Sequence, residues 1–227
     1  MRLLNHDEVR SIVESINERY RALVLVAAYC GLRAGELRGL RRRNVDMIAR
    51  TITVTAQLVD GPGGPTFADL KTAASRRSVP IPSTVATALA HHLEHFAQPG
   101  PDGLVFTSPQ GEPLRLEYFR RRQWAPACTK AGVGHLRIHD VRHTCASLAI
   151  AAGADLKVLQ RMLGHASAAM TLDRYGHLIP DQAEDVASRL DIGVQAAEAK
   201  ARAKAVPISI ARHARDTTEV PPAEETA

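Results

Sequence analysis

Four side chains that could bind or attack a phosphate lie within one short stretch of the chain. They are His139, Arg142, His165 and Tyr175, and they span 37 residues. A tyrosine hydroxyl, with a pKa of about 10, is a weak nucleophile until its proton is accepted and nearby cations stabilise the phenolate. An arginine can bind two phosphate oxygens at once. Each residue alone would more often have a structural role, but together they favour covalent chemistry at a phosphate.

The spacing of His139 and Arg142 suits an anion. They are three residues apart, so on a helix they share one face. We expect this helix to begin at about Asp140 and to hold both residues near its first turn. A helix N-terminus offers free N–H groups and the positive end of the helix dipole to a phosphate. A surface ion pair is the alternative role for an arginine at this place.

Earlier parts of the chain contain further groups of the same kind. Arg33 stands at an expected helix start and could supply a second guanidinium. Glu36 could orient Arg33, or simply form a surface ion pair with it one helical turn away. Lys71 lies in the turn KTAASRR and adds another cation. A shared site would require the fold to join these separate segments.

A metal site is the competing interpretation of the histidines. Two pairs have the i, i+4 spacing of metal ligands, His139 with His143 and His91 with His95. In the protease form of this motif a glutamate follows the first histidine, whereas here Asp140 does, and Arg142 would repel a dication. We therefore expect no metal, and we expect His91, His92 and His95 to be exposed helix residues.

Composition and charge favour a helical protein with a polyanionic partner. Hydrophobic residues make up 45% of the chain and aromatic residues only 4%, so the core must be built from Leu, Val, Ile and Ala. The last twelve residues hold four acids and no base, which leaves the preceding 215 with 29 bases, 20 acids and a net charge of +9. A basic body of this kind suits nucleic acid, although a solvated basic surface is the alternative.

The cysteines and the apolar segments indicate a soluble intracellular protein. Cys30, Cys128 and Cys145 are far apart and form no CxxC pair, so buried free thiols in a reducing cytoplasm are expected. The apolar run Ala22–Cys30 is much shorter than the roughly 20 residues of a membrane span, and no signal peptide opens the chain.

Periodicity and capping signals predict a mainly α fold with a small antiparallel β-sheet, an α+β class. An Asn5–Glu8 capping box opens the first helix, and Gly31 ends the second. Ser83, Asp155 and Ser167 are expected N-caps. Helices are expected over about 6–16, 18–30, 34–40, 83–96, 116–131, 140–152, 156–163, 168–175 and 181–190, with a detached one over 196–205 and disorder from 206. Strands are expected over about 51–55, 67–70 and 78–81, with a turn at 60–65, forming one sheet of about three strands.

Several separated segments together resemble the catalytic domain of the tyrosine recombinases, the phage-integrase family. GLRAGEL (31–37) is similar to the first arginine box of that family, and LKTAASRRSVPI (70–81) to its β-hairpin lysine segment. HDVRHTCAS (139–147) is similar to its H-x-x-R box, and LGHAS followed by TLDRYGHL to its second histidine and nucleophilic tyrosine. The resemblance covers residues 3–190 and implies the DNA breaking-rejoining fold of that family.

The resemblance implies a role for each matched residue. The implied catalytic residues are Arg33, Lys71, His139, Arg142, His165 and Tyr175, accompanied by the acidic Glu36. Tyr175 would attack a scissile DNA phosphate, form a 3′-phosphotyrosyl bond and release a 5′-hydroxyl. Lys71 would protonate the leaving group, and His139 would serve proton transfer at the tyrosine. Arg33, Arg142 and His165 would hold the non-bridging oxygens, so no metal, nucleotide or other cofactor would be needed.

The resemblance also implies partners and a domain layout. Double-stranded DNA would be the substrate, bound by a homotetramer in which a C-terminal helix passes to a neighbour, with accessory DNA-bending proteins as further partners. Residues 1–190 would form the catalytic domain and 191–227 a tail, while the usual N-terminal DNA-binding domain would be absent. Weak, salt-dependent DNA binding is then expected. The expected DNA contacts are Arg38, Arg41, Arg42, Arg43, Arg76, Arg77, Arg120 and Arg121.

Three alternatives to strand exchange remain open on the sequence. A type IB topoisomerase-like enzyme would cleave and religate one duplex in place with the same catalytic set. A non-catalytic module would bind DNA without cutting it, and a metal hydrolase would lose its activity on chelation.

Overall fold

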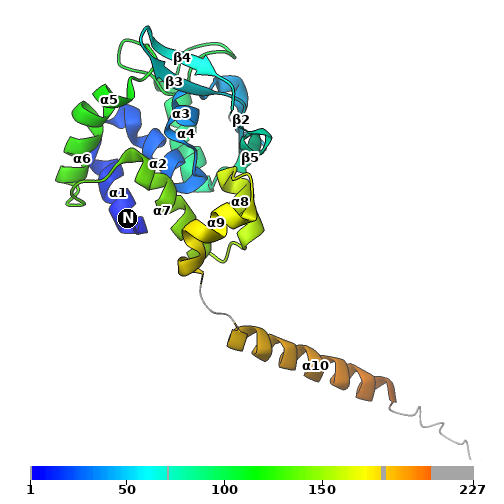
Figure 1. The fold of residues 1–227 in the computed structure, drawn as a ribbon. Coiled ribbons are helices and arrows are strands. Elements are labelled where there is room, and N and C mark those ends of the chain that lie inside the picture. The colour runs from blue at the N-terminus through cyan, green and yellow to red at the C-terminus, as the bar shows by residue number, and fades with distance from the viewer. Residues whose placement is uncertain (1, 71, 180–182, 206–227) are drawn as a thin grey trace, which may run out of the picture. The chain divides into compact units, whose positions relative to one another are not determined.

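The computed structural model describes residues 2–70, 72–179 and 183–205. They form two units divided after Ile179. In the first unit, packed helices form most of the fold, and the small sheets lie at one end (Figure 1). None of the described helices is long and apolar enough to cross a membrane.

The helices of the first unit follow the predicted order closely. They are α1 (His6–Ser15), α2 (Arg21–Cys30), α3 (Ala34–Arg38), α4 (Ser83–His95), α5 (Leu116–Phe119), α6 (Ala125–Lys130), α7 (Ile138–Ala151), α8 (Leu156–Leu163) and α9 (Ala168–Tyr175), with short 3₁₀ turns at Glu18–Tyr20, Arg42–Asn44, Ala73–Ser75 and Gly176–Leu178. The capping box of α1 is confirmed, because Asn5 Oδ1 accepts from the Glu8 N–H at 2.8 Å and Glu8 Oε2 accepts from the Asn5 N–H at 2.9 Å. The predicted caps Asp155 and Ser167 are also confirmed.

Three helix boundaries differ from the prediction. Helix α7 begins at Ile138, so Arg142 lies in its second turn and not in its first turn. Ser83 is the first residue of α4 and does not cap it, because Pro82 already supplies the extended residue at the N-cap. The segment expected as one helix over 116–131 contains a π-helical turn, Arg120–Trp124, between α5 and α6.

The strands form two sheets where one was predicted. Strands β1 (Val45–Asp46), β2 (Thr51–Val54) and β5 (Arg77–Pro80) form an antiparallel sheet in the order β1-β2-β5. Strands β3 (Gln57–Gly61) and β4 (Gly64–Ala68) form a separate hairpin whose pairing extends to Gly61 and Gly64. The predicted turn over 60–65 is confirmed but is shorter than expected, because the strands pair up to Gly61 and Gly64 and the chain reverses over residues 62–63.

Two groups of buried side chains hold the first unit together. The larger joins α1, α2, α4, α6 and the β1-β2-β5 sheet, with Trp124, Phe106 and Leu89 among its fully buried members. The smaller contains Ala146, Ile150, Leu159, Leu163 and Tyr175, from α7, α8 and α9. The predicted nucleophile therefore belongs to the smaller cluster.

The second unit contains one continuous helix, α10 (Ala183–Ala205). It joins the two helical segments that the sequence predicted separately, while the expected start at Asp181 and the expected disorder from 206 lie outside the described residues. Val186, Leu190 and Val194 are exposed and follow at intervals of four residues, so they share one face of α10.

The turn from α2 to α3 requires glycine at position 31. Gly31 has φ of 65°, and a Cβ there would lie 3.0 Å from Cys145 Sγ and 3.1 Å from Leu163 Cδ2. Gly132 has a similar φ of 72° but has nothing within 4 Å of the same position. Comparing an alanine substitution at each glycine therefore distinguishes the cost of backbone strain, which both share, from the cost of steric crowding, which arises only at Gly31.

We predict that Gly31→Ala lowers the free energy of unfolding by about 2–4 kcal/mol, and Gly132→Ala by about 1–2 kcal/mol. Urea unfolding of the two variants measures the difference. Equal losses would mean that Cys145 and Leu163 move aside without cost.

Candidate active site

The C-terminal end of α8 gathers three arginines from three other elements. The carbonyl oxygen of Met162 accepts from Arg77 Nε at 2.7 Å, that of Leu163 from Arg142 Nη2, and that of Gly164 from Arg33 Nη2 at 3.1 Å. The last carbonyls of a helix have no partner within the helix and carry the negative end of its dipole, so cations are stabilised there. His165 follows directly in the chain.

Arg33 and Glu36 form the part of this cluster that belongs to α3. Arg33 donates from its backbone N to Glu36 Oε2 at 2.7 Å and from Nη1 to Oε1 at 2.8 Å. The Glu36 side chain is 1% exposed and that of Arg33 33% exposed. Burial alone would raise the pKa of the Glu36 carboxyl, but hydrogen bonds and charge from Arg77 and Arg33 outweigh it and lower that pKa. Glu36 is therefore an ionised, buried orienting group for Arg33.

Arg142 is enclosed between two backbone carbonyls. Besides its bond to Leu163, it donates from Nη1 to the Gly31 oxygen at 2.5 Å, and only 4% of the residue is exposed. Burial and, after it, the charge of Arg33 lower the pKa of Arg142 to about 10, so it remains a cation at neutral pH. Arg142 thus links the end of α8 to the turn between α2 and α3.

The Tyr175 hydroxyl contacts a buried histidine. His143 Nδ1 and Tyr175 Oη are 2.7 Å apart, and Tyr175 is 1% exposed. The His165 ring is parallel to that of Tyr175, at 2° with 6.3 Å between centroids, and His165 Nδ1 is fixed by Thr171 Oγ1 at 2.9 Å. The tyrosine therefore has one imidazole at its hydroxyl and a second one parallel to its ring.

Burial sets the protonation of this pocket. Burial and then the neighbouring His139 lower the pKa of His143 to about 4, and burial and then Arg142 and Arg33 lower the pKa of His165 to about 4. Both rings are thus neutral near pH 7. Burial raises the pKa of the Tyr175 hydroxyl, and the positive charges of Arg142 and Arg174 offset only part of this effect. The neutral His143 ring has a nitrogen that can accept the hydroxyl proton of Tyr175, while its lowered pKa makes it a weak base in this closed pocket.

His139 was predicted to serve proton transfer at Tyr175, but in this structure another histidine contacts the tyrosine hydroxyl. His139 is exposed, with its ring centroid 5.1 Å from that of His143, and His143 is the histidine in hydrogen-bond contact with Tyr175. Sequence reasoning considered His143 only as a metal ligand. Its position four residues after His139, on the same helix face, was the signal that could have placed it at the tyrosine.

Lys71 lies outside the described residues, but its neighbours indicate where its segment runs. Leu70 and Thr72 line the same pocket as Arg33, Glu36 and Gly164. The chain on either side of the predicted general acid therefore borders the arginine cluster.

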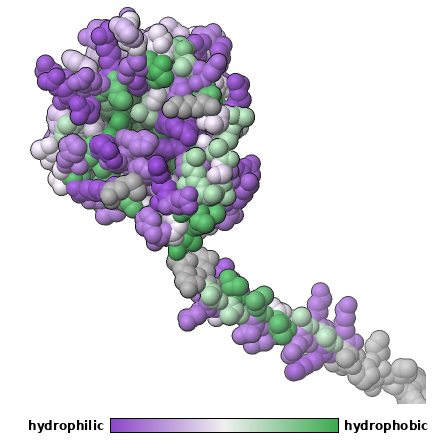
Figure 2. All heavy atoms as spheres, viewed as in Figure 1, coloured by the Kyte–Doolittle hydropathy of each residue, from purple (hydrophilic) through white to green (hydrophobic). Residues whose placement is uncertain are grey.

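The arginines predicted to contact DNA divide into three groups. Arg38 and Arg77 are not supported as DNA contacts, because their side chains are about 5% and 6% exposed and pair with Asp60 and Glu36 respectively. Three others are engaged at the surface: Arg41 and Arg43 pair with Asp102, and Arg42 donates to the Leu93 carbonyl. Arg76, Arg120 and Arg121 are exposed. The face of the first unit that Figure 2 shows is mostly hydrophilic, with hydrophobic areas between the hydrophilic ones.

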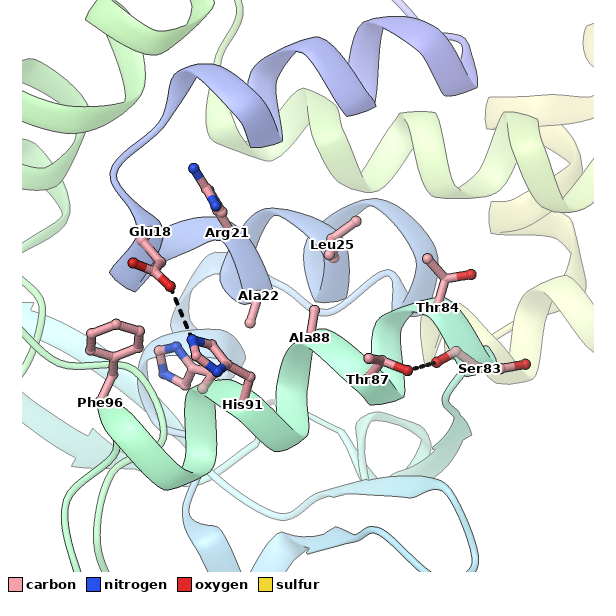
Figure 3. A pocket seen from close by; sticks show the side chains of 11 residues that line it. Glu18, Arg21, Ala22, Leu25, Ser83, Thr84, Thr87, Ala88, His91 and Phe96 are labelled. Atoms are coloured by element: carbon pink, nitrogen blue, oxygen red, sulfur yellow. Dashed lines mark hydrogen bonds and ion pairs between the residues drawn. The ribbon is translucent and has the colours of Figure 1, made fainter.

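A separate surface pocket between α2 and α4 contains none of the predicted catalytic residues (Figure 3). His91 lies in it and bonds Glu18 at 3.0 Å, while His95 Nδ1 lies 2.8 Å from the His91 carbonyl. His92, expected to be exposed, is buried and bonds the Val105 carbonyl at 2.7 Å, because its side of α4 faces the core. Among the described residues, no three His, Cys, Asp or Glu side chains are grouped to hold a metal ion.

Comparison with known proteins identifies the family of the chain. The sequence model described as "Phage integrase family" matches residues 2–181. The chain belongs to this family. The prophage phiRv2 integrase of Mycobacterium tuberculosis is 33% identical to it over 185 residues, which cover 81% of this chain and 49% of that protein. The integrase of Mycobacterium phage D29 is 30% identical over 191 residues, covering 82% and 50%. This phage-integrase chain thus spans about half the length of the curated relatives it matches.

Solved structures confirm the predicted fold class. The Tn1549 transposon integrase, in complex with a circular intermediate DNA, matches with a TM-score of 0.71 at 25% identity, covering 83% of this chain and 65% of that chain. XerA recombinase matches with a TM-score of 0.61 at 26% identity, covering 77% and 60%. The catalytic domain of bacteriophage HP1 integrase shares the fold, with a TM-score of 0.55 at 22% identity and coverage of 83% and 94%.

The depressed pKa of His143 predicts how stability depends on pH. Between about 6.5 and about 4 the unfolded chain binds a proton at this histidine and the folded chain does not, so the free energy of unfolding falls as the pH falls. His143→Gln, which removes the titrating ring, should therefore show a smaller loss of stability from about pH 7 to about pH 5 than the wild type. Urea unfolding at both pH values measures this loss.

If His143→Gln lost as much stability as the wild type between these two pH values, His143 would not be held neutral in the folded protein.

Proposed function

We propose that this protein is a site-specific DNA recombinase that cleaves and rejoins DNA through a 3′-phosphotyrosyl intermediate, with Tyr175 as the nucleophile. The observation that carries the proposal is the position of the Tyr175 hydroxyl, 2.7 Å from the neutral His143 ring and beside His165, in the unit that also gathers Arg33 and Arg142. The match of the phage-integrase family to residues 2–181 supports it.

The proposed reaction conserves the energy of the DNA backbone. Tyr175 Oη forms a bond to the scissile phosphorus as its proton passes to an imidazole; His143 is the one in contact, and His139 lies next to it. The bond from phosphorus to the 5′-oxygen breaks, and Lys71 protonates that oxygen. Attack by another 5′-hydroxyl reverses these steps and restores the tyrosine. No nucleotide is consumed, because one phosphate ester replaces another.

Two arginines and the neutral His165 imidazole supply the stabilisation that the transition state needs. Negative charge builds up on the non-bridging oxygens, and we assign Arg33, Arg142 and His165 to them. Preplaced donors at such oxygens contribute roughly 10²–10³ in rate each, and a placed general acid roughly 10²–10⁴. Groups of this kind do the work that a metal clamp does in other phosphoryl-transfer sites.

Tyr175 and Arg142 must be uncovered before a phosphate can reach them, since they are 1% and 4% exposed. The small cluster around Tyr175 is separate from the main core. Opening a small cluster costs less than global unfolding, so we assign the uncovering to a local movement of α9 or its neighbours.

Double-stranded DNA is the proposed partner, in the cytoplasm, with accessory DNA-bending proteins as further candidates. The exposed apolar face of α10, with Val186, Leu190 and Val194, supports the proposal that this helix passes to a neighbouring protomer in a homotetramer. Residues 1–190 are the proposed catalytic domain and 191–227 the proposed tail.

Tyr175→Phe should abolish covalent adduct formation. The measurement is an SDS-stable adduct on a nicked suicide duplex that carries a site recombined by the wild-type protein, with and without EDTA. Tyr118→Phe is the matched control, because Tyr118 is 63% exposed on α5 and should leave the adduct intact. An adduct that persists in Tyr175→Phe would exclude the assigned nucleophile, and loss of the wild-type adduct in EDTA would contradict metal independence.

Replacing Arg120 and Arg121 together by alanine should weaken binding to duplex DNA of any sequence. The logarithmic slope of affinity against salt concentration should fall by about 2, because two phosphate contacts are lost. Arg10→Ala is the control, since Arg10 is exposed on α1 and pairs with Asp7 and Glu14. An unchanged slope in the double variant would remove the π-helical turn from the DNA interface.

A further inference from the structure

Arg77 is a buried cation for which the proposed reaction has no direct use. It opens β5, its side chain is 6% exposed, and it lies six residues after Lys71. We propose, resting on the proposed function, that Arg77 is a positioning residue that holds Glu36 and the end of α8 so that Arg33 is directed at the scissile phosphate. Arg77 acts through these neighbours and does not touch DNA.

The contacts of Glu36 give the first reason. Its Oε1 accepts from Arg33 at 2.8 Å and from Arg77 Nη1 at 3.0 Å, and its Oε2 accepts from the Arg33 backbone at 2.7 Å and from Arg77 Nη2 at 2.9 Å. Arg77 therefore binds both oxygens of the carboxylate through its two terminal nitrogens, the bidentate arrangement that suits a planar guanidinium. The carboxylate that orients Arg33 is itself fixed by Arg77.

The charge of the cluster gives the second reason. Arg33 and Glu36 alone would sum to zero, and a neutral pair has little attraction for a phosphate. With Arg77 the three side chains carry a net charge of +1. In this arrangement the buried Arg77 neutralises Glu36, and the partly exposed Arg33 keeps its attraction for an anion.

The link to α8 gives the third reason. Arg77 Nε donates to the Met162 carbonyl at 2.7 Å, two residues before Gly164, whose carbonyl accepts from Arg33. A Cβ on Gly164 would lie 2.9 Å from Arg77 Cδ, and Gly164 has φ of 62°. Gly164, the residue before His165, thus fits closely against Arg77. Arg77 therefore contacts both Glu36 on α3 and the segment that leads into His165.

A substrate with a neutral phosphate distinguishes positioning from simple stabilisation. We would measure single-turnover adduct formation on two nicked duplexes, one with a normal scissile phosphate and one with a methylphosphonate, which lacks one negative oxygen. The variants are Arg77→Gln, Arg33→Gln as the reference, and Arg10→Gln as the control at an exposed arginine on α1. Each rate is divided by the wild-type rate on the same duplex.

On the normal phosphate, Arg77→Gln should be slower than wild type by about 10- to 100-fold, less than or equal to the loss for Arg33→Gln. On the methylphosphonate both losses should shrink, because a neutral phosphate needs less of the charge that Arg33 delivers. Arg10→Gln should match the wild type on both. Arg77→Lys, which keeps the charge but not the two parallel bonds, should lie in between and replaces Arg77→Gln if that variant unfolds.

An Arg77→Gln loss that is the same on both duplexes, while that of Arg33→Gln shrinks, would overturn the positioning role alone. A wild-type protein that forms no adduct on the normal duplex would overturn the proposed function, and the positioning role with it.

Discussion

The site depends on the hydrogen bonds that the last carbonyls of α8 accept from three arginines. Met162, Leu163 and Gly164 each present an oxygen that the helix cannot satisfy, and each takes a guanidinium from a different element. Backbone groups buried without a partner are costly, as are buried cations. One set of contacts removes both costs and also brings β5, α7 and the start of α3 to the residue that precedes His165.

The same contacts explain why separate sequence boxes form one site. Arg142 bridges the Leu163 and Gly31 carbonyls, so the turn that delivers Arg33 is joined to the helix end that delivers His165. Tyr175 returns to this region from α9, where one imidazole contacts its hydroxyl and a second one is parallel to its ring. The arginines are therefore placed largely by backbone carbonyls, whereas Tyr175 is placed by packing in the smaller cluster and by its contact with His143.

The sequence predicted most of the local structure and the candidate residues, but not their partners. Caps such as Asn5–Glu8 and Asp155 act within a few residues, so local patterns suffice for them. Pairing of β2 with β5 is non-local, and the sequence does not show which strands meet, so one sheet was expected where two exist. Arginine spacing likewise does not show burial. Arg77 looks like its exposed neighbour Arg76 on the sequence, and it is distinguished by distant partners, the Glu36 carboxylate 41 positions away and the Met162 carbonyl.

The use of carbonyl acceptors at the end of α8 has a consequence for mutational tolerance. Replacing the side chains of Met162 or Leu163 leaves in place the backbone oxygens that bind Arg77 and Arg142. Alanine substitutions at these two positions would therefore measure side-chain packing and would not detect the contacts with the arginines. The exception is Gly164, where any side chain must enter a left-handed backbone conformation and the space taken by Arg77. Substitutions at Gly164 or at the arginines would therefore disturb the contacts between the arginines and the end of α8. Substitutions at Met162 or Leu163 would leave the other two acceptor oxygens in place.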